Sequence, residues 1–525
     1  MKHYDVAVVG YGPTGLMLAA LLAQAGHRIL VLERWPQLYG RARLTHIDGE
    51  TVRLLSMACD IDHAMRDSSP IASFKFYNAK GRELLDVSAI PVTPMGHADH
   101  NSIFQPHIED ALDARVKSLA NATVLQGHEV TGIVLANDKV TLSYRTPGGT
   151  AEQASAGYVV GTDGANSFVR ETLGIERDDS GFNERWLNID GVYDGTLAPI
   201  YRQTVQHCDP ERGRMSMPIG KDRRRFEFGL KPGETAEEME SDETIARLLT
   251  QYFNVDPAKM RIDRKVIYHF QCRTAKHWRK GRALLAGDAA HTMPPYLGQG
   301  ACSGIRDAAN LAWKLGLVLR ARAPETILGT YETERRPHVT HIQKAAVSFG
   351  KVANTHSKIA AFIRDIVFRL NILPAPPPFP PLGPGVKQEA AGKAFVGRIG
   401  DVPPHGKVRI DGRTDWFDSF AGYAFSLIAK DDALTRLTPA QHAFLKDLGC
   451  NLFVLDEAPQ AEGVRAMTDL DGRFGSFLAA QSCQAMILRP DTNLFGLAET
   501  AAELPDLVDA LRARLGWRDT VAVAA

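Results

Sequence analysis

The sequence predicts an α/β protein with a Rossmann-like nucleotide-binding domain, an inserted antiparallel sheet and a smaller C-terminal α/β domain. Three observations lead to this expectation. A strand, a glycine-rich turn and a helix follow one another at the N-terminus, short strands without regular intervening helices fill residues 185–272, and seven prolines crowd residues 371–385. These patterns are typical of a parallel sheet, an antiparallel sheet and an extended linker, in that order.

The N-terminal stretch has the order of a dinucleotide-binding βαβ unit. The apolar run 6–9 precedes Gly10, Gly12 and Gly15, and a helix-period segment then leads to a second strand that ends at Glu33. The first glycine permits a tight turn, the second lets the backbone approach a pyrophosphate, and the third lets the helix pack closely on the strand. The pattern indicates a dinucleotide, without distinguishing a nicotinamide from a flavin.

Composition narrows the class of protein. The 525 residues carry 61 basic and 61 acidic side chains, which argues against nucleic acid or a membrane surface as the main partner. Six cysteines form no C-x-x-C pair, so we expect reduced thiols with neither a disulfide framework nor a metal site. Since no signal peptide and no uncharged span of 18 residues is visible, we expect a cytoplasmic protein.

The middle of the chain alternates between strands and helices. The sequence predicts an amphipathic helix over 108–119 and a hairpin from the runs 130–135 and 140–144. A buried strand then ends at Asp163-Gly164, and the carboxyl end of a strand is where α/β sheets place ligand contacts.

After the inserted sheet the parallel pattern returns. A strand over 283–286 ends at Gly287-Asp288, a loop rich in proline and glycine follows, and a long helix is predicted from about Cys302 to Arg320. Beyond the proline-rich segment, strands and a last amphipathic helix over 504–515 predict the small C-terminal α/β domain.

Three motifs taken together suggest a family. GYGPTG at 10–15, DG at 163–164 and GDAAH at 287–291 resemble the aromatic-ring flavoprotein monooxygenases, which are single-component FAD hydroxylases. MPPYLGQG, RDAANLAWKL and TYETERRPH are especially similar to the branch that includes 3-(3-hydroxyphenyl)propionate hydroxylase. In that branch a thioredoxin-like domain without redox cysteines follows, which the missing C-x-x-C pair fits.

The resemblance implies where the domains begin and end. We expect a FAD-binding domain in residues 1–70, 100–184 and 273–370, a substrate-binding sheet in 71–99 and 185–272, a proline-rich linker in 371–385 and a thioredoxin-like domain in 386–525.

The resemblance also implies which residues bind FAD. The expected cofactor residues are Gly10, Gly12, Pro13, Thr14, Gly15, Glu33, Arg34, Arg43, Gln105, Asp163, Gly164, Arg170, Gly287, Asp288, Pro295, Gly298, Gln299, Gly300 and Ala301. By position alone, Arg34, Arg41 and Arg43 can face phosphates or be solvated loop charges, and both interpretations stay open.

The reaction implied is hydroxylation of a phenol, ortho or para to its hydroxyl group. NADH or NADPH would reduce FAD, O2 would give a C4a-hydroperoxyflavin, and the inserted sheet would keep the site dry. Preference for NADH is itself implied by the resemblance. The alternatives are another FAD enzyme on the same fold, such as an oxidase or a halogenase, and a non-catalytic nucleotide-binding module. The W-x-W-x-I-P stretch of halogenases does not occur.

The substrate side is less well defined by sequence. The candidates are His46, Tyr201, Arg214, Met215, Phe228 and Tyr296. His46 stands where relatives often carry a small residue, so it reaches the substrate or fills a gap, and Arg214 could receive an acidic substrate. No residue can be assigned as the catalytic base. A homodimer is possible, and a small aromatic molecule is the expected partner.

Overall fold

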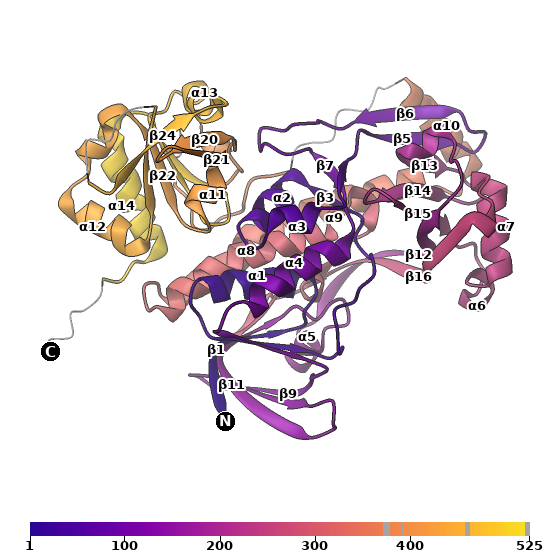
Figure 1. The fold of residues 1–525 in the computed structure, drawn as a ribbon, viewed down its shortest axis with the longest axis horizontal. Helices are drawn as coiled ribbons and strands as arrows, with labels where there is room; N and C mark the ends of the chain where they lie inside the picture. Colours follow the sequence, from indigo (N-terminus) through magenta and orange to yellow (C-terminus); the bar gives the residue numbers. More distant parts are fainter. Residues whose placement is uncertain (371–378, 391, 394, 457–461, 520–525) are drawn as a thin grey trace.

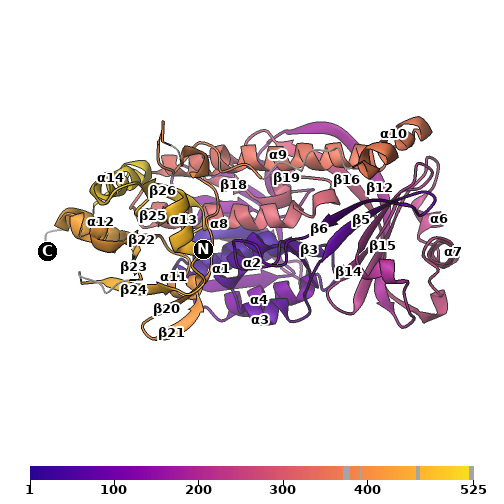
Figure 2. The same ribbon diagram turned by 90° about the horizontal axis from the view of Figure 1, so that it is seen from above.

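In a computed structural model of the chain, residues 1–519 are described except 371–378, 391, 394 and 457–461. Three regions lie in a row (Figures 1 and 2). An α/β region occupies the middle, an antiparallel sheet lies on one side of it, and the C-terminal domain lies on the other. No helix in the described part of the chain combines the length and hydropathy that a transmembrane span requires.

The central sheet confirms the predicted βαβ unit. Its strand order is β17-β18-β11-β1-β2-β8, and β9 and β10 extend it beside β11. Its strands are β1 (Lys2–Val9), β2 (Ile29–Glu33), β8 (Ala122–Gln126), β9 (Glu129–Leu135), β10 (Val140–Arg145), β11 (Ala151–Gly161), β17 (Arg279–Lys280) and β18 (Ala283–Leu285). Because β1 runs parallel to both β2 and β11, the carboxyl ends of these strands meet at one edge.

Three helices pack beside this sheet. The helix α1 (Pro13–Gln24) lies between α4 (Gln105–Lys117) and α8 (Gly300–Leu319), and it contacts both. Both α1 and α8 begin at the edge where the parallel strands end, so their N-termini point toward the same space (Figure 1). A fourth helix, α9 (Gly329–Ala353), packs on α8 and leads to α10 (Lys358–Arg369).

The second sheet is mostly antiparallel, with the order β19-β16-β12-β15-β14-β13-β5-β6. Its strands are β5 (Ser73–Asn78), β6 (Glu83–Ser88), β12 (Arg177–Tyr193), β13 (Thr204–Cys208), β14 (Arg214–Ile219), β15 (Arg223–Gly229), β16 (Met260–Ala275) and β19 (His291–Thr292). The pairing of β12 with β16 continues beyond the predicted range 185–272 at both ends. The domain boundaries stay a proposal, and 371–378 of the expected linker lie outside the described residues.

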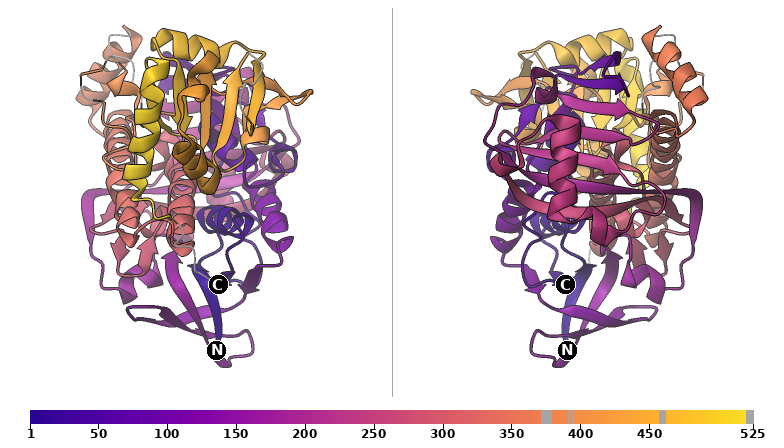
Figure 3. Two further views of the ribbon diagram at one scale, coloured as in Figure 1. Left: turned by 90° about the vertical axis from the view of Figure 1, so that its left-hand side faces the viewer. Right: turned by 90° about the vertical axis from the view of Figure 1, so that its right-hand side faces the viewer.

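The two faces of this sheet differ. The helix α7 (Asp242–Phe253) covers the outer face (Figure 3). Its Leu248 and Phe253 are buried in one apolar cluster with Phe226 and Phe228. The inner face looks toward the central region. Side chains alternate between the faces along each strand, so a shift of one residue moves a side chain from one environment to the other.

The C-terminal sheet has the order β21-β20-β24-β23-β22-β25-β26. Its strands are β20 (Lys407–Ile410), β21 (Arg413–Trp416), β22 (Ser426–Lys430), β23 (Asn451–Leu455), β24 (Val464–Asp469), β25 (Ala485–Leu488) and β26 (Leu494–Ala498). β22 runs parallel to β23 and antiparallel to β25, and the helices α12 (Pro439–Leu448) and α14 (Leu504–Leu515) follow β22 and β26. This arrangement supports a thioredoxin-like fold, which stays a prediction.

The C-terminal domain holds α8 through buried polar groups. The Tyr423 hydroxyl donates to the carbonyl of Ala309 and accepts from the amide of Trp313, both in α8. The Lys314 ammonium lies 2.8 Å from the Glu334 carboxylate of α9, which also pairs with Arg489 of the C-terminal domain at 2.7 Å. We call Lys314, Glu334, Arg489 and Asp491 the α8 charge cluster. All four are buried, and breaking such a set leaves an unpaired buried charge.

A second contact joins the C-terminal domain to α2 (Gly49–Ser56). The buried Arg53 guanidinium donates to both carboxylate oxygens of Asp418, at 2.6 and 3.0 Å. Since Asp48 caps the same helix, α2 links the C-terminal domain to the edge of the central cavity.

Candidate active site

One cavity of about 1910 Å³ lies between the central region and the inner face of the antiparallel sheet. Ordinary ligand pockets measure about 300–1,000 Å³, so this cavity has room for a large cofactor and a second, smaller molecule. Most of the expected cofactor residues line it. They are Gly10, Gly12, Pro13, Thr14, Glu33, Arg34, Arg43, Gln105, Asp163, Gly164, Asp288, Pro295, Gly298, Gln299, Gly300 and Ala301.

The glycine-rich turn faces the cavity with its backbone. A Cβ atom on Gly12 would meet no protein atom within 4 Å, so this side of the turn is open. At Gly10, where φ is +100°, a Cβ would lie 2.6 Å from the carbonyl oxygen of Thr162. The turn therefore needs glycine for packing at one position and leaves backbone free for a ligand at the other.

Gly15, Gly287 and Arg170 lie behind the lining instead of in it. A Cβ on Gly15 would lie 2.2 Å from the carbonyl oxygen of Gly10, and one on Gly287 would lie 2.6 Å from Thr14 Oγ1. The buried Arg170 guanidinium donates to the carbonyls of Ala165 and Ala289, at 3.1 and 3.3 Å. These residues shape the cavity by holding the loops that line it.

Two strand-end carboxylates are held by backbone amides. Glu33 accepts from the amides of Tyr11 at 2.7 Å and Trp35 at 2.9 Å. Asp163 accepts from the hydroxyl of Ser167 at 2.5 Å and from the amide of Val169 at 3.0 Å. Burial raises the pKa of Asp163, while these hydrogen bonds oppose the rise.

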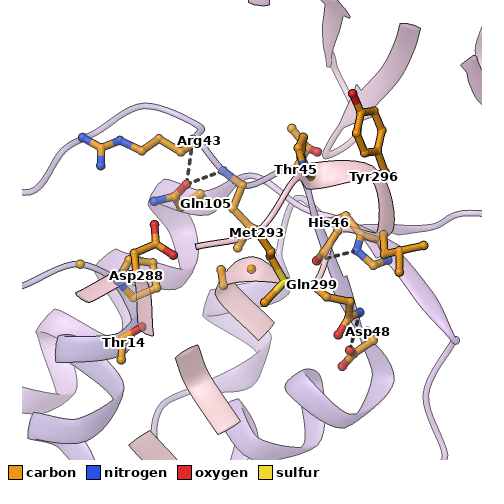
Figure 4. Close-up of a pocket in the computed structure, with 18 of the residues that line it drawn as sticks. Thr14, Arg43, Thr45, His46, Asp48, Gln105, Asp288, Met293, Tyr296 and Gln299 are labelled. Atoms are coloured by element: carbon orange, nitrogen blue, oxygen red, sulfur yellow. Dashed lines mark hydrogen bonds between the residues drawn. The ribbon is translucent and has the colours of Figure 1, made fainter. Parts of the chain in front are cut away.

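Gln105 fixes the loop that carries Arg43. Its side-chain oxygen accepts from the amides of Arg43 at 2.8 Å (Figure 4) and Leu44 at 2.7 Å. Its Nε2 donates to Glu109 at 2.7 Å. The Arg43 guanidinium stacks 3.9 Å from the centre of the Tyr39 ring. Arg34 and Arg43 line the cavity and Arg41 does not, which favours ligand contact for the first two.

The Asp288 carboxylate is accessible from the cavity and makes no hydrogen bond to another described residue. The walls of the cavity reduce its hydration, and this desolvation raises the pKa of Asp288. Figure 4 shows Asp288 beside Thr14 at one end of the cavity, with Tyr296 and His46 at the other. A carboxylate that is exposed to a cavity can accept hydrogen bonds from a ligand there, and a ribityl chain carries the hydroxyl groups that suit it.

The opposite end of the cofactor half is the loop 295–300, which leads into α8. No side chain caps the N-terminus of α8, so its first amides are free to face a ligand. Gln299 donates from Nε2 to Asp48 at 2.9 Å, and Arg306 donates to Gln299 Oε1 at 2.9 Å and to Asp48 at 2.6 Å. Gln299 is therefore held toward α2, which leaves the backbone of the loop at the cavity.

His46 lies directly against this loop. Its Nδ1 is 3.4 Å from the carbonyl oxygen of Gly298, and its Nε2 is 2.7 Å from Nδ1 of His100. Burial lowers the pKa of His46 to about 4, and the neighbouring His100 adds to this shift. A Cβ on Gly298 would lie 2.3 Å from the His46 ring, so the two positions are matched in size.

The inner face of the antiparallel sheet forms the far wall. Gln206, Met215, Met217, Arg225 and Glu227 line the cavity from β13, β14 and β15. These side chains were missed in the sequence, except Met215, because β13 and β14 are short and their register is set by pairing.

Three of the substrate candidates lie elsewhere. Tyr201 and Phe228 belong to the core under α7, and Arg214 pairs with Asp209 at 2.8 Å. Arg214 and Met215 are consecutive in β14, so only one of them can face the cavity. His46, Met215 and Tyr296 do line it.

The polar groups of this wall are mostly paired with one another. Arg225 donates to Asp190 at 2.6 and 2.8 Å and to the carbonyls of Ala42 and Arg43. The Tyr296 hydroxyl donates to Glu184. Glu227 accepts from Asn188 Nδ2 at 3.0 Å, and burial raises the pKa of Glu227 to about 7.

Two family models match the chain. A model described as "FAD binding domain" matches residues 3–346, and one described as "HcaD C-terminal domain" matches residues 400–514. The first covers the βαβ unit, both strand-end motifs and the loop before α8, so the cavity described above lies in a FAD-binding domain.

Relatives align along nearly the whole chain. A probable NADH-specific resorcinol 4-hydroxylase of Rhodococcus jostii (strain RHA1) is 33% identical over 97% of this chain and 95% of its own length. A 3-(3-hydroxy-phenyl)propionate/3-hydroxycinnamic acid hydroxylase of Comamonas testosteroni is 30% identical over 94% of each chain.

Solved structures show the same fold. The ternary complex of aklavinone-11 hydroxylase with FAD and aklavinone has a TM-score of 0.78 at 24% identity and covers 98% of this chain and 100% of that one. The flavin-dependent monooxygenase PieE, in complex with FAD and substrate, has a TM-score of 0.80 at 18% identity and covers 98% and 99%.

Proposed function

This chain belongs to the family of FAD-dependent aromatic hydroxylases, and on that premise we propose that it hydroxylates a small, uncharged phenol with O2 and NADH. The polar lining of the substrate half carries this proposal. The antiparallel sheet contributes two cations to the cavity, Lys75 and Arg225, and both are paired. Lys75 lies 2.8 Å from Asp86 and 3.3 Å from Glu83, and Arg225 is committed to Asp190.

A wall with paired cations suits a neutral ligand. The acid Glu227 also lines it, and a carboxylate accepts hydrogen bonds from hydroxyl groups but repels another carboxylate. Met215, Met217 and Phe74 supply apolar contact for an aromatic ring. Resorcinol, which the name of the Rhodococcus jostii relative contains, has the chemistry that this wall would recognise.

A hydroxyphenyl acid is the second candidate, because the Comamonas testosteroni relative is named for such substrates. Its carboxylate would have to draw Lys75 away from Asp86 and Glu83 at the rim. Those ion pairs are partly exposed, and exposed pairs contribute only about 0–1 kcal/mol. The structure thus favours the neutral phenol by charge while leaving one route to the acid.

When bound, FAD supplies the redox chemistry, which is reduction by the nicotinamide and activation of O2 for transfer to the ring. The residues of the chain supply binding, orientation and a dry site. Gly12 and the amides at the start of α1 would hold the pyrophosphate, and Asp288 would bind the ribityl hydroxyls. The free amides at the start of α8 would stabilise negative charge on the flavin by about 0.3–1 kcal/mol.

The test is a phenol panel with the purified holoenzyme. We expect a yellow protein whose NADH oxidation is stimulated by resorcinol more than by 3-(3-hydroxyphenyl)propionate, with hydroxylated product formed in proportion. If 3-(3-hydroxyphenyl)propionate stimulates NADH oxidation and resorcinol does not, the hydroxyphenyl acid is the substrate and the neutral phenol is not. A protein that no phenol stimulates would contradict hydroxylation of phenols altogether.

The proposal includes a cytoplasmic location and a homodimer. All six cysteines are free thiols, which suits a reducing compartment.

The helix α10 exposes Ile359, Phe362 and Ile363, and an exposed apolar face of this kind supports self-association. Light scattering after gel filtration, compared between the wild type and Phe362→Ser, tests the dimer.

A further inference from the structure

We propose that Glu227 is the catalytic base that takes the proton of the substrate's hydroxyl group. The inference rests on the proposed function, because it assigns a role inside the same cavity. It starts from the position of Glu227 on β15, where it faces the cavity while its neighbours Phe226 and Phe228 face α7. The alternation of the strand therefore places one acid on the inner wall.

One of the two carboxylate oxygens of Glu227 has a hydrogen-bond partner in the protein. Oε1 accepts from Asn188 Nδ2 at 3.0 Å, which fixes the side chain, and Oε2 makes no hydrogen bond to another described residue. The residue is only 5% exposed, yet it lines the cavity. A buried carboxylate oxygen that opens onto a cavity is expected to have a hydrogen-bond donor there, and a phenol provides one.

The charged and polar groups around Glu227 are held by other partners, so none of them occupies its Oε2. Arg225 lies 3.9 Å away but is held by Asp190, and the Tyr296 hydroxyl of the facing loop donates to Glu184 instead. Burial and the negative charge of Asp190 favour the protonated form of Glu227, whereas Arg225 and Asn188 favour the ionised form. With a pKa of about 7, this group exchanges its proton near neutral pH, as a general base requires.

Other titratable groups of the cavity are less suited. Asp48 is paired with Arg306, Glu109 is bonded to Gln105, and Asp288 lies at the cofactor end. His46 has both ring nitrogens near partners, Gly298 and His100. Asp86 of β6 also lines the cavity, but it pairs with Lys75 at 2.8 Å. Glu227 is thus the acid on the wall formed by β13, β14 and β15 with an oxygen available to a substrate.

One proton moves from the phenol hydroxyl group to Glu227. The O–H bond of the phenol breaks as an O–H bond forms on Glu227 Oε2, and the electron pair of the broken bond stays on the phenol oxygen. The carboxylate becomes a neutral acid and the phenol becomes a phenolate. The added electron density lies ortho and para to the oxygen, which are the positions where the ring then accepts oxygen.

The first measurement is proton release on substrate binding. Because burial raises the pKa of Glu227 to about 7, part of this carboxylate is protonated near neutral pH, and a phenol that donates to Oε2 requires the ionised form. We therefore expect calorimetry of the holoenzyme with resorcinol, in two buffers of different ionisation enthalpy and from pH 6 to 8, to show proton release that decreases as the pH rises. Binding without proton release in the wild type would overturn the proposal. If 3-(3-hydroxyphenyl)propionate is the better substrate, it serves as the probe.

The matched variants are Glu227→Gln, which keeps the size and the contact to Asn188, and Glu237→Gln, which removes an exposed acid from α6 (Ala236–Met239) beyond the outer face. We expect Glu227→Gln to bind FAD, to lose the proton release and the acidic limb of the kcat–pH profile, and to lower kcat by about 10²–10⁴-fold. Glu237→Gln should retain the proton release, the acidic limb and the wild-type kcat. An acidic limb that persists in Glu227→Gln would overturn the assignment.

Two failures are distinguishable. If the wild type hydroxylates resorcinol but Glu227→Gln has the same kcat and pH profile, the inference fails and the proposed function stands. If the wild type hydroxylates no phenol, both fail. Should Glu227→Gln not fold, the wild-type proton release decides the matter by itself.

Discussion

The two ends of the cavity recognise their ligands by different means. The cofactor end is built mainly from backbone: the glycine turn, two uncapped helix N-termini and the loop 295–300. The substrate end is built from side chains that alternate along strands, such as Met215, Arg225 and Glu227. A backbone site depends on a few glycines at fixed spacing, whereas a side-chain site depends on the register of a whole sheet.

The largest expected effect tests the backbone end. Gly15→Val would place side-chain atoms against the carbonyl oxygen of Gly10, where even a Cβ comes within 2.2 Å. The turn must then open, and we expect a colourless protein with at least a ~100-fold loss of FAD affinity, measured by flavin absorbance. Gly329→Ala is the control, because a Cβ there meets nothing within 4 Å. A yellow Gly15→Val protein would break the comparison.

The second effect tests how the substrate wall is anchored. Arg225→Met leaves the buried Asp190 with a more distant cation, Arg264 at 3.9 Å, and without its hydrogen-bonded partner, which we expect to cost about 3–5 kcal/mol in the free energy of unfolding. Denaturant unfolding measures this. Adding Asp190→Asn should recover part of the loss, since the buried carboxylate that lost its hydrogen-bonded cation is then neutral. Equal stability of the single and double variants would show that hydrogen bonds to Ala42 and Arg43, and not the charge, matter here.

The third effect is pH-dependent. Folding raises the pKa of Glu227 from 4.5 to about 7, so the native state holds a proton that the unfolded chain has lost between these values. Burial of Glu227 therefore lowers the free energy of unfolding as pH rises through this window, by up to about 3 kcal/mol above pH 7. Glu227→Gln should be more stable than the wild type at pH 8 and equally stable at pH 4.5, as thermal unfolding at the two pH values will show. The opposite sign would mean that Glu227 is paired as an anion.

The smallest effect separates two roles of His46. His46→Ala should leave the FAD content unchanged and raise KM for the phenol by about tenfold, because the ring contacts Gly298 and borders the substrate half. With a pKa of about 4, His46 stays neutral in assays, so the KM ratio to wild type should be constant from pH 6 to 8. An unchanged KM would make His46 a space-filling residue.

At the cofactor end of the cavity, much of the lining could be predicted from the sequence. Gly10, Gly12 and Asp288 were predicted from local spacing and from the ends of strands, and all three line the cavity, while their contacts with the cofactor stay a prediction. Gly15 and Gly287 were predicted to bind the cofactor, but they lie behind the residues that line the cavity. A glycine that is needed for packing behind a turn and one that contacts a ligand in front of it look the same in the sequence.

At the substrate end, local spacing carries less information. Arg214 and Phe228 were chosen by residue type, and the pleat of β14 and β15 turns both away from the cavity. Glu227 stands beside Phe228 and was missed, because only the pairing of β15 with β12 and β14 decides which of the two faces inward. The seven-stranded C-terminal sheet was likewise predicted only in part, since its short strands depend on one another for burial.

The α8 charge cluster has a consequence for building hybrid enzymes. Lys314 and Glu334 belong to helices of the FAD-binding part, and Arg489 and Asp491 belong to the C-terminal domain. A hybrid that takes its C-terminal domain from a relative must therefore take the matching positions of α8 and α9 with it, or bury a charge without its counterpart. An exchange at the proline-rich segment alone would separate Lys314 and Glu334 from the native Arg489 and Asp491.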